Sequence, residues 1–360
     1  MISGFMTACG GKEADKTNNV TTASVPLSGK ANTDDKITVT DSAGKKVEVP
    51  TRIERIADAW GAHNAVLSML GFGDKIVATT LNPKLKPWLY KVTPGLDKAV
   101  TAFSVDASNI NMEEIAKVKP DIAFMPSGNK SMDKFTEAGI PVVQVSFKNF
   151  DSLIKCVQLT GDILGDSGKE KANLYISYLS KKLAMVKGIT KEIPEKDKPK
   201  VLHLADLSPL KVDGKDTIIN SWIEAAGGIN AAKDIGGNIQ EVSVEQILKW
   251  NPDIIIVSST VGNKDRKKSI DEILKSDTWG QLEAVKKHKV YINPDGAFSW
   301  DRYSAEEALQ VQWAAKLIWP DKFKDISVEN ETKYFYKTFF NYDLSEKEVN
   351  RIINGQPPEN

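Results

Sequence analysis

Two stretches of the chain share one pattern: Asn111-Met-Glu-Glu-Ile-Ala-Lys-Val-Lys-Pro-Asp-Ile-Ala-Phe-Met125 and Ser243-Val-Glu-Gln-Ile-Leu-Lys-Trp-Asn-Pro-Asp-Ile-Ile-Ile-Val257. Each opens with a residue that caps helices, and Glu114 or Gln246 follows three positions later, as in a capping box. Each then reads as a short helix, a proline that cannot continue it, and an apolar strand. Helix, Pro-Asp and buried strand form half of a βαβ unit, so the recurrence predicts two similar α/β lobes.

The segments around these stretches extend the same pattern in both directions. Residues 37–49 alternate about an Asp-Ser-Ala-Gly turn and predict a β-hairpin. A loop bounded by prolines is expected at 81–95, and Ser167 with Glu170 predicts the capped start of a long helix. Apolar runs predict strands at 53–59, 76–80, 122–125, 142–146, 201–205, 254–258 and 290–293. Helical patterns lie at 62–70, 112–119, 131–138, 151–164, 217–226, 244–250, 269–275, 280–287, 305–318, 329–340 and 345–353.

Length and charge exclude several classes of protein. The chain has 360 residues, with 48 Lys and Arg against 48 Asp and Glu, so it lacks the net positive charge of a nucleic-acid binder. No run of 18 apolar residues predicts a transmembrane helix. Two cysteines cannot form a disulfide framework, and three scattered histidines cannot form a His-rich metal cage. We therefore expect no metal site built from a cluster of histidine or cysteine side chains.

The first residues indicate where the protein resides. Met6-Thr7-Ala8-Cys9-Gly10-Gly11 resembles the lipobox of bacterial lipoproteins, in which Cys9 would become the acylated N-terminus. Met6 stands where Leu is commonest, and the short segment before Cys9 predicts that the signal peptide begins upstream. Residues 10–36 are polar and too poor in apolar side chains to fold, which predicts a flexible tether. We expect a lipid-anchored protein outside the cytoplasm.

The whole layout resembles the substrate-binding lipoproteins of ABC importers for iron–siderophores, haem and corrinoids. The resemblance covers about residues 37–355 and depends on the order of several motifs. They are Arg52–Gly73, the two Pro-Asp stretches, Ala226-Gly-Gly-Ile-Asn230, Trp300-Asp-Arg-Tyr-Ser304, Leu317-Ile-Trp-Pro320 and Lys333–Phe340. It implies two Rossmann-like lobes joined by one long helix, with a ligand cleft between them. The expected parts are a truncated signal segment (1–9), the tether (10–36), an N-terminal lobe (37–166), a connecting helix (167–189) and a C-terminal lobe with terminal helices (190–360).

The resemblance also implies the partners. Glu113 and Glu245 occupy matching places in the two stretches, where the family presents one glutamate per lobe to arginines of the permease dimer. The alternative is an acid in the first turn of a helix, which the helix dipole favours by about 0.3–1 kcal/mol. We expect a monomer that binds a small molecule and hands it to the permease unchanged.

Ligand-binding residues are expected at the carboxyl ends of the predicted strands, where open α/β sheets bind their ligands. Aromatic rings there offer flat apolar area, Arg302 a planar fork for an anion, and His63 a hydrogen bond or a metal ligand. Core packing of Trp60 and Trp300 and a pairing of Arg302 with Asp301 remain alternatives. The predicted set is Trp60, His63, Asn82, Trp88, Ser127, Asn129, Phe147, Leu207, Thr260, Phe298, Trp300 and Arg302.

The predicted ligand is a ferric chelate, and no resident cofactor is expected. Haem is an alternative that needs axial ligands such as His63 with Met125 or Met132, and a corrinoid or an oxyanion such as molybdate also remains open. An enzyme on the same frame is disfavoured, because the chain contains no Gly-x-Gly-x-x-Gly, Walker, His-Glu-x-x-His or Gly-x-Ser-x-Gly motif. No catalytic residue is therefore assigned. A passive surface adhesin is the third hypothesis, and saturable quenching of tryptophan fluorescence by a chelate would exclude it.

Overall fold

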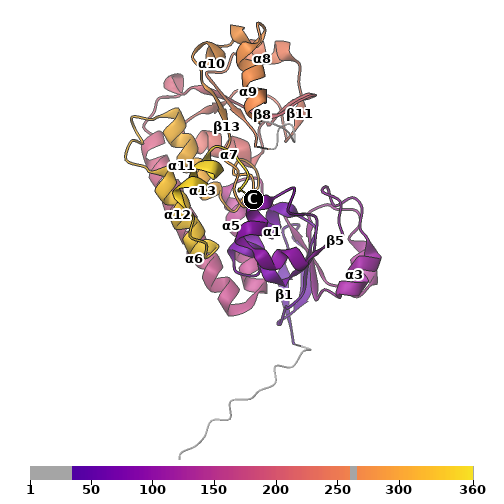
Figure 1. Cartoon of the computed structure of the whole chain (residues 1–360). Helices are drawn as coiled ribbons and strands as arrows, with labels where there is room; N and C mark the ends of the chain where they lie inside the picture. The colour runs from indigo at the N-terminus through magenta and orange to yellow at the C-terminus, as the bar shows by residue number, and fades with distance from the viewer. Residues whose placement is uncertain (1–34, 260–265, 360) are drawn as a thin grey trace, which may run out of the picture. The chain divides into compact units, whose positions relative to one another are not determined.

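The computed structural model describes residues 35–259 and 266–359 (Figure 1). The first lobe is built on a five-stranded parallel sheet with the order β5-β4-β3-β6-β7. Its strands are β3 (Ile56–Asp58), β4 (Ile76–Thr79), β5 (Val100–Thr101), β6 (Ile122–Pro126) and β7 (Val142–Val145). Before it, β1 (Lys36–Thr40) and β2 (Lys46–Pro50) form the predicted antiparallel hairpin.

The second lobe contains a six-stranded sheet with the order β11-β9-β8-β12-β13, and β10 also pairs with β8. Strands β10, β8, β12 and β13 run parallel, while β9 at one side pairs antiparallel with both β8 and β11. The strands are β8 (Lys200–Leu207), β9 (Leu210–Val212), β10 (Ile229–Asn230), β11 (Gln240–Glu241), β12 (Ile254–Val257) and β13 (Val290–Ile292). Two separate sheets confirm the predicted two-lobed α/β fold.

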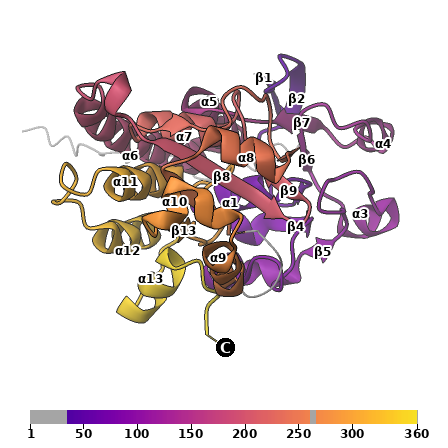
Figure 2. The same cartoon turned by 90° about the horizontal axis from the view of Figure 1, so that it is seen from above.

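Helices surround both sheets. Those of the first lobe are α1 (Gly61–Met69), α2 (Pro87–Val92), α3 (Met112–Val118), α4 (Asp133–Glu137) and α5 (Phe150–Ile163). Later in the chain come α7 (Ile218–Ala225), α8 (Val244–Trp250), α9 (Arg266–Lys275), α10 (Glu283–Lys286), α11 (Glu307–Ile318), α12 (Val328–Phe339) and α13 (Glu346–Ile353). Helix α8 and strand β8 lie near each other in the second lobe in both views (Figure 1 and Figure 2).

One long helix, α6 (Gly165–Thr190), separates the two lobes in the sequence and packs against α5, α7 and α11. The predicted capping box at Ser167 is wrong, because α6 starts at Gly165 and no side chain caps it. Gly165 has φ of 78°, a left-handed conformation that favours glycine, and it lets α5 turn directly into α6. No helix in residues 35–259 or 266–359 is long and apolar enough to cross a bilayer.

The repeated stretches fold alike, as predicted. The side chain of Asn111 accepts a hydrogen bond from the Glu114 amide at the start of α3, and Ser243 accepts one from the Gln246 amide at the start of α8. Lys119 and Asn251 end these helices in left-handed conformations, with φ of 43° and 44°. Strands β6 and β12 follow, so each stretch delivers a buried central strand to its own sheet.

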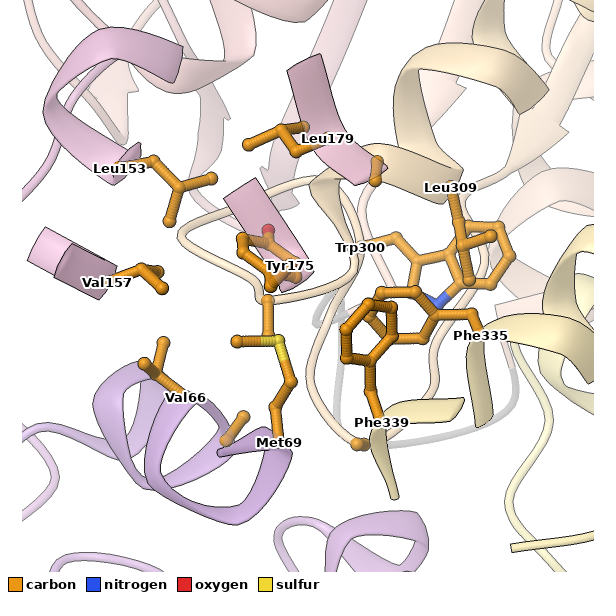
Figure 3. Close-up of a cluster of buried hydrophobic side chains, with 14 of the residues drawn as sticks. Val66, Met69, Leu153, Val157, Tyr175, Leu179, Trp300, Leu309, Phe335 and Phe339 are labelled. Atoms are coloured by element: carbon orange, nitrogen blue, oxygen red, sulfur yellow. The ribbon is translucent and has the colours of Figure 1, made fainter. Parts of the chain in front are cut away.

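The largest apolar core contains residues from both lobes. Val66 and Met69 of α1 and Tyr175 of α6 belong to the same buried cluster as Trp300 and Phe335 (Figure 3). Two smaller clusters each belong to one lobe, one around Ala57, Phe103 and Phe135 and one around Leu204, Ile247 and Ile255.

The predicted loop at 81–95 is partly wrong, because it contains α2, which begins with Pro87 at a position where a helix needs no amide hydrogen.

Candidate ligand-binding cavity

The order of strands in the first sheet locates a crevice. Strand β3 pairs with β4 on one side and with β6 on the other, so the direction of chain progression reverses there. Open α/β sheets bind ligands at such switch points, beyond the carboxyl ends of the strands. Trp60 follows β3 and Ser127 follows β6, so both residues lie at this point.

A cavity of about 540 Å³ lies there. Its size is within the range of about 300–1,000 Å³ that is usual for small-molecule sites. Most of its wall belongs to the first lobe, and Tyr303 contributes from the loop before α11. The lining residues are Ser42, Trp60, Pro126, Ser127, Val145, Ser146, Phe147, Lys148, Ser152, Lys155 and Tyr303.

Three aromatic rings from distant parts of the sequence meet at the cavity. The ring centroid of Trp60 lies 5.1 Å from that of Phe147 and 5.8 Å from that of Tyr303. Phe147 and Tyr303 are 5.7 Å apart in an edge-to-face arrangement. Such contacts favour well-defined ring positions, so the trio forms a stiff apolar wall.

The polar side of the cavity is cationic. Lys148 and Lys155 line it, and no carboxylate is among the described residues that do. Both lysines are exposed, and neither forms an ion pair within residues 35–259 and 266–359. Hydroxyl groups add further donors, and Ser127 Oγ lies 3.2 Å from Ser146 Oγ. The cavity therefore offers apolar rings and positive charge together.

The structure brings together three of the predicted binding residues, Trp60, Ser127 and Phe147. Sequence reasoning missed Tyr303, although it lies in the motif Trp300-Asp-Arg-Tyr-Ser304 that supported the resemblance. It also missed Lys148 and Lys155. The available signal was their place directly after β7 and in the first turns of α5, at the same strand ends that supplied Phe147.

The prediction that Trp300 lines a cleft is wrong. Its side chain is fully buried in the large core, and its Nε1 donates to Glu306 Oε1 at 2.9 Å. A buried indole needs such an acceptor, and Glu306 comes from the start of the next helix. Trp300 thus supports the loop before α11 and offers no face to a ligand.

His63 and Trp88 are also buried and occupied by structural contacts, so their predicted ligand contacts are wrong. His63 lies within hydrogen-bond distance of Asp58 Oδ2 through Nδ1 and of Thr160 Oγ1 through Nε2, each at 2.9 Å. It cannot act as the haem ligand considered above in this arrangement. Trp88 Nε1 donates to the carbonyl of Gln356 at 2.8 Å.

Arg302 is bonded within the protein through one guanidinium nitrogen. Its Nη2 lies 2.6 Å from Asp213 Oδ2, and the residue is 9% exposed. The predicted anion contact of Arg302 is therefore wrong, and the alternative partner Asp301 is replaced by a carboxylate 89 positions away. Asp213 itself follows β9 in the second lobe.

Four further predicted residues lie outside the cavity wall. Asn82 accepts from the amides of its own turn, and Asn129 donates to the carbonyl of Ala107. Leu207 packs against the core of the second lobe, and Phe298 lies under the ammonium group of Lys86 at 4.6 Å. Thr260 and Cys9 lie outside the described residues.

Glu113 and Glu245 occupy equivalent positions, each exposed in the first turn of α3 or α8. Hydrogen bonds from its own amide and from Ser243 lower the pKa of Glu245. Both side chains are therefore available to a partner. In the described residues, no group of three or more His, Cys, Asp and Glu side chains could hold a metal ion.

These features define a two-lobed α/β protein with a ligand cavity at strand ends. Over residues 61–297 the chain matches the family described as periplasmic binding protein, and it belongs to that family. The family consists of extracytoplasmic substrate-binding proteins of ABC importers, in the class that includes binders of iron–siderophores, haem, cobalamin and molybdate. Its members bind their substrates and are not enzymes.

Three relatives illustrate the match. A periplasmic solute-binding protein of Veillonella parvula is 32% identical, with a TM-score of 0.77 over 89% of this chain and 97% of its own. An uncharacterised ABC transporter substrate-binding lipoprotein of Bacillus subtilis, YvrC, is 27% identical over 80% of this chain and 87% of its own. The molybdate-binding protein MolA of Haemophilus influenzae is 24% identical over 84% of this chain and 90% of its own.

Proposed function

We propose that this protein carries an anionic ferric chelate in the cavity beside Trp60 and delivers it unchanged to an ABC permease. The proposal depends on one observation, which is that three aromatic rings line the same cavity as two lysines that have no ion pair in the described part of the chain. Ferric siderophores and ferric citrate combine carboxylate or catecholate charge with a bulky, rigid body. Positive charge attracts such an anion, and stiff rings bind its flat faces with little loss of conformational entropy.

The lysines provide the first test. We expect Lys148→Gln with Lys155→Gln to weaken the binding of ferric citrate at least tenfold, because two positive charges leave a partly enclosed site. Tryptophan fluorescence, titrated with ferric citrate and with a catecholate and a hydroxamate chelate, measures the change.

The matched control changes Lys171 and Lys181 to Gln. Both are exposed on α6 away from the cavity lining, so the net charge changes equally. Equal losses of affinity in the two double variants would show that only overall charge matters. No saturable response to any chelate would reject the proposal.

Molybdate is a second candidate, because the match to the molybdate-binding protein MolA extends over 90% of that protein. The lysines and serines of the cavity could bind an oxyanion without using the rings. Trp60→Ala separates the two ligands. We expect it to weaken chelate binding about tenfold or more and to leave molybdate binding within about twofold, since a small oxyanion has no flat apolar face. The reverse result would favour molybdate.

Docking to the permease is assigned to Glu113 and Glu245. The repeated helices place one exposed carboxylate on each lobe, which suits a permease made of two like subunits. We expect Glu113→Ala with Glu245→Ala to abolish uptake by cells that express the importer and to leave ligand affinity unchanged.

The control for docking changes Glu170 and Glu192 to Ala. Both are exposed, and they lie on and just after α6. Uptake should persist in this control. Loss of ligand affinity in the Glu113 and Glu245 variant would instead place these residues in the binding site.

Cys9 is proposed as the site of lipid attachment. An acylated cysteine followed by a polar segment would hold the folded part close to the membrane. With its own signal sequence in its own host, the Cys9→Ser variant should move from the membrane fraction to the soluble extracytoplasmic fraction. Unchanged fractionation would exclude lipidation at Cys9.

A further inference from the structure

A fully buried ion network lies in the second lobe. His203, in the middle of β8, lies between two carboxylates that are both without solvent exposure. Its Nδ1 is 2.8 Å from Asp213 Oδ2, and its Nε2 is 2.9 Å from Asp301 Oδ2. An ionised carboxylate only accepts hydrogen bonds, so a ring that bonds to both must donate from both nitrogens. With both carboxylates ionised, as the lowered pKa of each indicates, His203 is an imidazolium ion.

Arg302 completes the charge balance. It is bonded to the same Asp213 oxygen, so two carboxylates face two cations. Other groups hold the network in place. The indole of Trp222 on α7 donates to the Asp301 carbonyl at 3.0 Å. Ser258, which follows β12, forms a side-chain hydrogen bond with Asp301. With both carboxylates ionised, the charges of His203, Arg302, Asp213 and Asp301 sum to zero.

Tyr303 follows these two fixed residues directly. Its backbone has φ of 56°, a left-handed conformation that side chains larger than glycine rarely adopt without support. Its hydroxyl is bonded to the side-chain amide of Asn238, and the next amide, that of Ile239, donates to Asp213 Oδ1 at 2.9 Å. Asp213 therefore holds both Arg302, which precedes Tyr303, and Ile239, which follows the Asn238 partner of the Tyr303 hydroxyl.

We propose that His203 is a positioning residue for the binding site. Through Asp213 and Asp301 it fixes the loop that presents the Tyr303 ring to Trp60 and Phe147. The claim about affinity rests on the proposed function, whereas the claim about the position of Tyr303 does not. His203 would never touch the ligand, and its proton would still determine the shape of one cavity wall.

The titration of His203 supports this assignment and predicts its pH dependence. Burial alone lowers the pKa of His203, but hydrogen bonds and charges of Asp213 and Asp301 outweigh it and raise that pKa. Burial likewise raises the pKa of Asp301, but His203 and Arg302 outweigh it and lower that pKa to about 2. The groups around His203 and its partners are Asp213, Asp301, Arg302, Ser258, the Trp222 ring and the buried carboxyl group of Glu307, which interacts electrostatically with Asp301. The network is complete at neutral pH and loses one hydrogen bond as the pH rises through the raised pKa of His203.

The first measurement needs neither ligand nor variant. Ring-nitrogen NMR of histidine-labelled full-length protein should show both nitrogens of His203 protonated at pH 7, and His288→Gln serves to assign the exposed histidine. The ring resonance of Tyr303, in protein with 13C-labelled tyrosine and assigned with Tyr303→Phe, should shift on raising the pH with the same midpoint as His203. Burial raises the pKa of the Tyr303 phenol, which keeps its own titration at higher pH. A neutral His203 ring at pH 7, or a Tyr303 resonance that does not follow it, would overturn the proposal.

The second measurement uses His203→Gln, with His288→Gln as the matched control. We expect the Tyr303 resonance to move in the first variant only, and the affinity for ferric citrate to fall about tenfold. Circular dichroism checks that the variant is folded. If it is unfolded, the NMR titration of the unsubstituted protein still tests the proposal. A moved resonance with unchanged affinity for every chelate and for molybdate would support the positioning role and reject the cavity as the ligand site. An unmoved resonance in folded His203→Gln would reject the positioning role itself.

Discussion

At the scale of single residues, Glu306 organises the loop that carries Trp300 and Tyr303. It is fully buried, and it accepts from Trp300 Nε1 at 2.9 Å, from the Phe298 amide at 2.8 Å and from the Tyr336 hydroxyl at 2.5 Å. Burial raises the pKa of Glu306 to about 7, because it outweighs these hydrogen bonds. The carboxyl group thus joins the loop to Tyr336 of α12, and the free energy of burying it depends on pH.

The pH dependence of stability should report this cost. Because the folded pKa of about 7 exceeds the ordinary value of 4.5, the folded protein binds more protons between these values than the unfolded chain. The contribution of Glu306 to the free energy of unfolding therefore falls as the pH rises from 4.5 to 7, by up to about 3 kcal/mol. Urea unfolding at several pH values should show a shallower slope for Glu306→Gln than for the exposed control Glu170→Gln.

Equal pH slopes for the two variants would mean that Glu306 titrates in the ordinary range.

At the scale of elements, α2 connects the first lobe to the end of the chain. Lys86, just before α2, lies 3.2 Å from Asp295 and 2.6 Å from Ser299, with both charged side chains nearly buried. Trp88 donates to the Gln356 carbonyl, and Lys91 pairs with Glu348 of α13 at 3.0 Å. These contacts, together with α6, restrict how far the lobes can separate on this side.

Trp88→Phe tests that connection. It keeps most of the buried apolar area and removes the hydrogen bond to Gln356, so we expect a loss of about 1–2 kcal/mol. Hydrogen exchange should accelerate in α13 more than in α8. Uniform acceleration over both helices would indicate global destabilisation and no specific role in docking the C-terminal segment.

At the scale of the whole molecule, one apolar core is shared by both lobes. Tyr175 of α6 and Phe335 and Phe339 of α12 pack edge to face or tilted, and α1 of the first lobe joins the same cluster (Figure 3). Because the lobes share buried area, their unfolding should be coupled. Each of the two smaller apolar clusters lies in one lobe and stabilises only the sheet of that lobe.

Phe335→Ala should therefore destabilise both lobes. We expect a loss of about 3–5 kcal/mol and a single transition, with hydrogen exchange accelerated equally in β3 and β8. Phe135→Ala, in the smaller apolar cluster of the first lobe, is the control. It should accelerate hydrogen exchange in β3 more than in β8. Two separate transitions in the first variant would show that the shared core does not couple the lobes.

The two-lobed fold, the long connecting helix and the equivalence of Glu113 and Glu245 could all be predicted from the order of residues alone. These depend on local periodicity, capping residues and Pro-Asp breaks, and such signals can be read within about ten to twenty residues. The same reasoning placed Trp60, Ser127 and Phe147 at strand ends, where the cavity lies.

Which loop side chains face the cavity became clear only from the folded molecule. Trp60 and Trp300 look alike in sequence, yet Trp60 lines the cavity and Trp300 is buried against Glu306. Arg302 finds its partner 89 positions away, and Trp88 finds its partner 268 positions away. Loop side chains have no periodic pattern that fixes their direction, so their orientation depends on contacts with residues distant in sequence, which exist only once the chain has folded.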